Sequence, residues 1–149
     1  MNAIQLLKRR LLSIPIELMI RDAAEANKDV IEDMNSQQLL KGTYTSGRDI
    51  TPTYRNPIYA AAKQFMNARP KPGVPDIKLT GAYHESITAT VTGGGISMEA
   101  TDEKAQDLED KYGNELIGLS EESRGELAHG YIKPHVLEQV YDYLSRWRQ

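Results

Sequence analysis

The stretch that decides the fold is Ser86-Ile-Thr-Ala-Thr-Val-Thr-Gly-Gly-Gly-Ile-Ser-Met-Glu-Ala-Thr101. Apolar residues alternate with hydroxyl residues in 86–92, and apolar residues alternate with polar residues again in 96–101. A period of two is typical of a β-strand that buries one face. The Gly-Gly-Gly run at 93–95 predicts a tight turn between the two segments. We therefore expect an antiparallel hairpin in a central antiparallel β-sheet.

The chain before the sheet is expected to form a helical N-terminal region, 1–42. Residues 3–14 form a short helix that ends at Pro15, because a proline ring opposes a continuing helix. From residue 16 onward, apolar residues recur at a spacing of three to four, which predicts one amphipathic helix through residue 40. Gly42 is well placed to end this helix.

Residues 43–75 are expected to form an extended loop that contains one short helix. The segment 41–56 is rich in turn-forming residues and has no hydrophobic periodicity. Asn56 precedes a proline, and this pair predicts a helix start, because asparagine caps free N–H groups and proline fits the first turn. The helix covers 58–66, and the proline-rich stretch 70–75 follows it as a stiff connector.

The region 76–149 is expected to combine the sheet with C-terminal helices. The alternation in 77–79 predicts a further strand before the hairpin. One helix is expected to begin at Thr101 or Asp102 and to end at Gly113.

The last two helices are expected to be separate. A short helix starts at Ser120, is interrupted near Gly125 and finishes at Gly130, and the final helix begins at Pro134. The apolar stripe of the final helix consists of Leu137, Val140, Tyr141, Leu144 and Trp147. We expect the sheet or a neighbouring subunit to bury this stripe, so that Leu144→Ala costs about 2–4 kcal/mol. The whole chain, 1–149, is then one α+β domain with N-terminal helices, a central antiparallel sheet with a Gly-Gly-Gly hairpin, and a C-terminal amphipathic helix.

Composition and charge exclude several classes of function. The 149 residues include no cysteine, which excludes disulfides, a thiolate nucleophile and zinc ribbons. The formal net charge of −3 argues against a dedicated DNA-binding domain, because such domains carry a basic excess. No apolar run approaches the roughly 18 residues of a membrane-spanning helix, and no signal-peptide cleavage site is evident. We expect an intracellular origin and no membrane partner.

No catalytic or metal-binding set is predicted. The Gly-Gly-Gly run lacks the Lys-Ser/Thr pair and the helix of a phosphate-binding loop. His84, His129 and His135 occupy different elements, which disfavours a Ser-His-carboxylate arrangement. The spacing of the last two histidines does not place both on one helical face, as a zinc site on a helix requires. We therefore expect no enzymatic activity, no cofactor and no metal.

Two segments are candidates for contact with other molecules. The window 99–126 holds ten acidic and three basic residues, which suits a docking surface for a basic partner or a face that repels an anionic polymer. Ordering the segment 41–56 costs roughly 16–32 kcal/mol of backbone entropy, so we expect burial against a neighbour to stabilise it. The residues predicted to make these contacts are Tyr44, Ile50, Tyr54, Asp102, Glu103 and Asp107.

One stretch carries a resemblance to a known group of proteins. Thr80-Gly-Ala-Tyr-His-Glu-Ser-Ile87, which leads into the hairpin, resembles a Thr-Gly-x-aromatic-x-x-Ser-Ile element of neck and tail-completion proteins of tailed bacteriophages. Proteins of this kind from phages of Bacteroides-like hosts are also similar at 100–102, 111–113 and 117–119. The resemblance covers roughly residues 76–132 and leaves out the first helices.

The resemblance implies a structural virion protein without catalytic activity. Such proteins form a ring at the neck or head–tail junction, as connector or tail-completion components, and are assembled in the host cytoplasm. The implied partners are further copies of the chain and portal, neck or tail proteins, while packaged DNA is only a passing polymer. The helices and the segment 41–56 would contact neighbouring subunits.

A second class of function remains open from the residues alone. The chain could be a small intracellular adaptor or regulatory module, of bacterial or phage origin, whose terminal helices dock a partner protein. Such a module would be a monomer or a dimer without a ring-forming surface.

Overall fold

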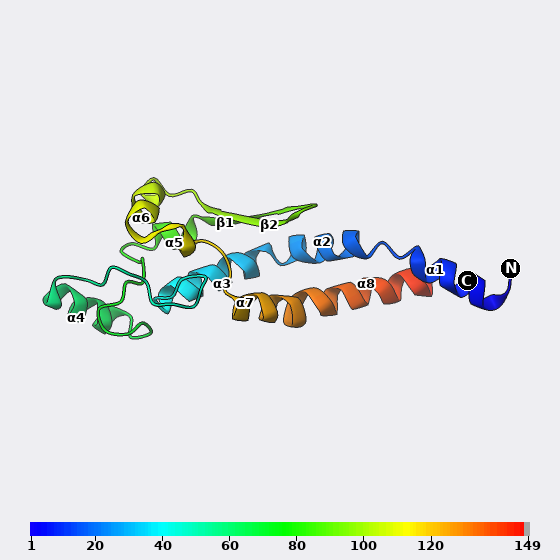
Figure 1. The fold of residues 1–149 in the computed structure, drawn as a ribbon, viewed down its shortest axis with the longest axis horizontal. Helices are drawn as coiled ribbons and strands as arrows, with labels where there is room; N and C mark the ends of the chain where they lie inside the picture. Colours follow the sequence, from blue (N-terminus) through cyan, green and yellow to red (C-terminus); the bar gives the residue numbers. More distant parts are fainter. Residues whose placement is uncertain (148–149) are drawn as a thin grey trace.

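The computed structural model describes residues 1–147 and shows an elongated α+β fold that is mostly helical (Figure 1). Three helices, α1 (Ala3–Leu12), α2 (Ile16–Ala26) and α3 (Lys28–Leu40), follow one another along the long axis. Helix α1 forms one end of the molecule, and α4 (Pro57–Met66) lies at the other end. The expected fold class, with N-terminal helices, an antiparallel sheet and a C-terminal helix, is confirmed.

The sheet consists of β1 (Ile87–Thr92) and β2 (Gly95–Ala100), which pair antiparallel over their full length. Gly93 and Gly94 connect the strands, and Gly95 already belongs to β2. The apolar residues of β1 are buried and its threonines are exposed, as the alternating pattern indicates. Within residues 1–147 the sheet has these two strands, so it is a ribbon beside the helices rather than a central sheet.

Residues 77–79 do not form the predicted strand. Ile77 has a positive φ of 54°, and Asp76 Oδ1 accepts a hydrogen bond from the Lys78 N–H at 3.0 Å. The backbone therefore turns at this point, and the four-residue helix α5 (Ala82–Glu85) follows. Two alternating apolar residues are too short a pattern to outweigh a turn in which a carboxylate binds a backbone donor.

The predicted helix over residues 16–40 is broken at Asn27, which ends α2 and precedes α3. Asn27 has φ −117° and ψ 24°, outside the helical region. Its side-chain Nδ2 donates to the Ala23 carbonyl at 2.8 Å, and its backbone N–H bonds to the Ala24 carbonyl instead. Asparagine side chains compete with the helical backbone in this way.

The C-terminal part begins with α6 (Ala105–Tyr112) and a 3₁₀ turn (Asn114–Leu116), and it continues as one helical rod. The rod consists of α7 (Glu121–Glu126), a π-helical segment (Leu127–Ile132) and α8 (Lys133–Ser145). The predicted interruptions near Gly125 and at Gly130 are therefore wrong.

Pro134 accounts for the widened π-helical segment. Proline has no N–H, and in an α-helix its ring would clash with the carbonyl four residues earlier, which belongs to Gly130. In the π-helical segment the hydrogen bonds reach five residues back, as from the Lys133 N–H to the Ala128 carbonyl. The wider backbone lets the rod continue past the proline.

Helix α8 lies beside α2 and runs in the opposite direction (Figure 1). Gln139 Nε2 donates to the Met19 carbonyl at 3.4 Å, and the Tyr143 hydroxyl donates to the Ser13 carbonyl at 3.1 Å. The single chain does not bury the predicted apolar stripe, because no residue of α8 is buried and Leu137 is 44% exposed.

Two groups of buried side chains form the core. The larger group joins the end of α3, the segments 41–56 and 74–77, α5, β1, the start of α6 and the 3₁₀ turn. Its members are Leu39, Tyr44, Ile50, Val74, Ile77, Tyr83, Ile87, Ala105 and Leu116. The smaller group joins α3, β1 and the π-helical segment through Ile31, Ala89 and Leu127. Helix α1 contributes no buried residue to either group.

Candidate functional site

Two of the six predicted contact residues, Tyr44 and Ile50, lie inside the core. Tyr44 is 6% exposed and Ile50 is 0% exposed. The Tyr44 hydroxyl donates to the Tyr112 carbonyl at 2.6 Å and accepts from the Thr51 N–H at 3.1 Å. The expectation that these two residues need a neighbour for burial is wrong, because distant parts of the same chain cover them. The segment 41–56 has no hydrophobic periodicity, so its sequence does not show that Tyr44 and Ile50 pack in the core.

Three of the other four residues meet in a cleft of about 400 Å³ between α4 and α6. Tyr54, Asp102 and Glu103 all line it, together with Tyr59. The Tyr54 and Tyr59 rings pack edge to face with their centroids 5.0 Å apart. Burial raises the pKa of the Tyr54 hydroxyl, which therefore stays protonated. Asp107 is exposed on the first turn of α6, outside the lining of the cleft.

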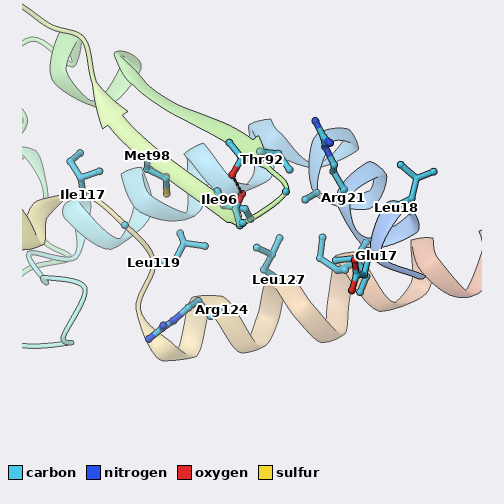
Figure 2. Close-up of a pocket in the computed structure, with 18 residues that line it drawn as sticks. Glu17, Leu18, Arg21, Thr92, Ile96, Met98, Ile117, Leu119, Arg124 and Leu127 are labelled. Atoms are coloured by element: carbon cyan, nitrogen blue, oxygen red, sulfur yellow. Dashed lines mark hydrogen bonds between the residues drawn. The ribbon is translucent and has the colours of Figure 1, made fainter. Parts of the chain in front are cut away.

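A groove of about 1090 Å³ runs between α2, the tip of the hairpin and the segment 117–132 (Figure 2). Its walls are mainly apolar. The apolar lining residues are Leu18, Ile20, Ala24, Val91, Ile96, Met98, Ile117, Leu119, Leu127 and Ile132. Figure 2 shows Leu119 and Leu127 between the C-terminal rod and the strand that carries Ile96 and Met98. Sequence reasoning missed this groove because its walls come from segments far apart in the chain.

The charged residues that line the groove are Glu17, Arg21 and Arg124. Leu18 is 55% exposed and Ile20 is 45% exposed, so part of the apolar wall faces solvent. Such a surface suits an apolar segment of another protein.

A buried ion pair connects α4 to the turn before α5. Lys63 Nζ lies 2.8 Å from Asp76 Oδ1, and the two side chains are 9% and 4% exposed. Lys63 also donates to the Lys78 carbonyl, and Asn67 Nδ2 donates to Asp76 Oδ2 at 3.1 Å. Burial alone would raise the pKa of Asp76, but hydrogen bonds from Lys63, Lys78 and Asn67 hold it below its ordinary value. The charged pair therefore holds α4 against the core.

His84 lies beside this pair and also has a structural environment. Its Nε2 is 2.9 Å from the Asp76 carbonyl, so Nε2 carries a proton and donates it. Burial lowers the pKa of His84, and this effect is larger than the opposite effect of Asp76, which raises it. Among residues 1–147, no three His, Asp or Glu side chains are grouped closely enough to hold a metal ion.

Comparisons of the chain with protein-family models, curated proteins and solved structures find no match. In the part of the chain that the structure describes, no helix has both the length and the hydropathy needed to span a bilayer. The function is therefore inferred from the chain's own surfaces.

Proposed function

We propose that this chain is a structural subunit that assembles with copies of itself into a ring. The observation that carries the proposal is the accessible surface of the single chain, 10044 Å². A compact monomer of 16.7 kDa exposes about 7,600 Å². The excess of about 2,400 Å² reflects the elongated shape (Figure 1), and it is large enough for two interfaces that each bury about 1,200 Å² of this chain. A subunit with two different interfaces forms a ring when the rotation between neighbours closes.

Helix α1 contributes apolar surface to this excess. Ile4, Leu7 and Leu11 recur at i, i+3 and i+7, and they are 77%, 57% and 51% exposed. An apolar stripe on a helix of this kind is normally buried against another element. In the single chain no residue of α1 is buried. A neighbouring subunit that covers the stripe would explain why this face of α1 is apolar.

The apolar face of helix α4 is exposed to solvent. Ile58, Ala61, Ala62 and Phe65 recur at i, i+3, i+4 and i+7, and all four are exposed, Phe65 to 94%. The buried residue of α4 is the charged Lys63. Large exposed apolar patches mark protein–protein contacts. This outward stripe supports a second interface at the end of the molecule opposite α1.

The assembly that we propose is the neck of a tailed bacteriophage, where the chain would form a connector or tail-completion ring. The support for this location is the resemblance of residues 80–87 to neck and tail-completion proteins. The part of the acidic window 99–126 that no neighbouring copy covers would face packaged DNA or a portal, neck or tail protein. In this proposal the chain is a virion component, assembled in the host cytoplasm.

Light scattering and negative-stain microscopy of the purified chain test the proposal. The expected result is a concentration-dependent particle with a mass that is a multiple of 16.7 kDa and a ring-shaped projection. Ile58→Ser with Phe65→Ser should reduce that mass without a change in circular dichroism, because both side chains are exposed in the single chain. A wild-type chain that remains monomeric at every concentration would refute assembly.

The apolar groove favours a second candidate, a small intracellular adaptor that binds one apolar segment of another protein. Grooves of this kind accept amphipathic helices. An adaptor would be monomeric or dimeric in the same measurements, and it would show no ring in the micrographs. Mass and particle shape therefore separate the two candidates.

A further inference from the structure

The cleft between α4 and α6 has an aromatic wall and an acidic edge. Its aromatic lining residues are Tyr54, Tyr59, Tyr83 and Tyr112, which are half of the eight tyrosines in the chain. Asp102 and Glu103 line the cleft, and so do Lys78 and Lys104. The surrounding stretch 102–110 carries five acidic residues and one lysine, so acidic charge predominates there.

Tyr83, which lines the cleft, has a buried hydroxyl without a hydrogen-bond partner among the described residues. Tyr83 is 4% exposed. Buried hydroxyls are nearly always paired, because leaving one unpaired costs free energy. Burial raises the pKa of Tyr83, and the negative charge of Glu109 adds a smaller effect in the same direction. The Glu109 carboxylate adds negative charge close to Tyr83, which favours a positively charged partner at this side of the cleft.

Tyrosine rings beside carboxylates bind basic side chains. A Lys or Arg within about 6 Å of a tyrosine ring is attracted to its face, and a neighbouring carboxylate adds to the attraction. Lys111 already makes such a contact on this helix, with Nζ 5.0 Å from the centroid of the Tyr112 ring. The chemistry of the cleft therefore fits a basic segment of a protein.

Helix α1 has the side chains that this cleft would bind. Residues 1–16 contain three basic residues and no acidic residue. Lys8 and Arg9 are exposed and take part in none of the ion pairs found within residues 1–147. Arg10 is already engaged, because its guanidinium lies 4.8 Å from the centroid of the Trp147 ring. Helix α1 lies at the opposite end of its own molecule from the cleft, so only another copy can bring it there (Figure 1).

We propose that the cleft between α4 and α6 binds helix α1 of a second copy of this chain. Lys8 and Arg9 then lie against the tyrosines and near Glu103 and Asp107. The inference rests on the proposed function, and it names the contact that joins neighbouring subunits head to tail. A helix of 10 residues is about 15 Å long, and its leucines would cover Leu79, which lines the cleft and is 74% exposed. Each copy uses two different surfaces, so the contact repeats around the assembly.

Charge reversal on each surface tests this contact. One variant carries Lys8→Glu with Arg9→Glu, and the other carries Glu103→Lys with Asp107→Lys. Each is expected to be monomeric in light scattering at concentrations where the unchanged chain is oligomeric. Helix content should be kept, because all four side chains are exposed. The chain with all four substitutions should recover the oligomer, and a mixture of the two variants should give oligomers that contain both.

Matched controls reverse the same number of charges elsewhere, as Lys41→Glu with Lys133→Glu and as Glu121→Lys with Glu122→Lys. Both controls should keep the oligomer. If the unchanged chain assembles but the cleft and α1 variants also assemble, or if the fourfold variant stays monomeric, the contact is refuted and the proposed function stands. If the unchanged chain never assembles, both fail. Loss of assembly in Ile96→Lys, with both cleft and α1 variants still assembled, would place the contact between subunits in the apolar groove and overturn the inference.

Discussion

Replacing Lys63 by methionine tests how the fold holds α4 in place. Lys63 Nζ is 2.8 Å from Asp76 Oδ1, and the two side chains are 9% and 4% exposed. Methionine keeps an unbranched stem but removes the charge, which leaves a buried carboxylate with only the Lys78 N–H and Asn67 Nδ2 as donors. Removing one partner of a buried ion pair costs about 3–5 kcal/mol, because the other charge stays buried without compensation.

The chain offers a matched control in Lys71→Met. Lys71 Nζ lies 2.9 Å from Asp49 Oδ2, but these side chains are 75% and 40% exposed. Exposed ion pairs contribute only about 0–1 kcal/mol, because water and salt screen them. The same substitution at nearly the same distance therefore separates the effect of burial from the effect of the pair itself.

Urea unfolding, followed by circular dichroism at a fixed protein concentration, measures both variants. Equal losses of stability for the Lys63 and Lys71 variants would refute the reasoning.

A pH series adds a second check. Asp76 has a lowered pKa in the wild-type fold, so its stabilising effect is present above its unfolded value of 3.8 and is lost as the pH falls below that value. Without Lys63, burial raises the pKa of Asp76, so this carboxyl takes up a proton in the folded variant as the pH falls. The difference in free energy of unfolding between wild type and variant should therefore narrow between about pH 7 and pH 4.

Wild-type stability should decrease as the pH falls below about 6.5, because His84 has a lowered pKa and takes up a proton more readily in the unfolded chain. Thermal unfolding should show this decrease, and His84→Gln should show less of it. Leu116→Ala should cost about 2–5 kcal/mol in urea unfolding, because Leu116 is 0% exposed. Leu144→Ala should cost only about 1 kcal/mol in the monomer, because Leu144 is half-buried, and equal losses would contradict this packing. Brief trypsin digestion of the monomer should cut at residues 8–10 first, since no residue of α1 is buried. Mass spectrometry that finds the first cut after Arg48 would contradict this order.

Local sequence patterns predicted the elements whose stabilising partners are close in sequence. The hairpin follows from the alternation on each side of the glycines, and its strands pair within one short stretch. Two helix starts follow from capping side chains. Asn56 Oδ1 accepts from the Ile58 N–H at 2.9 Å, and Ser120 Oγ accepts from the Ser123 N–H at 3.2 Å.

Some wrong predictions have local causes, such as the side-chain hydrogen bonds of Asn27 and Asp76 to nearby backbone groups. Others concern residues whose surroundings come from distant segments. Ile50 lies in a segment without periodicity, yet it shares a core with Leu116. Lys63 is buried because Asp76 reaches it from the connection after α4, and a helical wheel of α4 does not contain that information. The groove was not predicted for the same reason, because α2, the hairpin and the segment 117–132 form it together. Periodicity shows that a face is apolar, but it does not show which segment covers that face.

The pairing of α2 with α8 also has a consequence for synthesis of the chain. The hydrogen bond from Gln139 to Met19 spans 120 residues. A ribosome that adds about 5–20 residues per second needs about 6–24 s to make that span. During this time the side of α2 that α8 covers in the finished fold, where Gln139 meets Met19, faces water or a chaperone. A chain released before α8 is made would keep this face open and would be prone to aggregation.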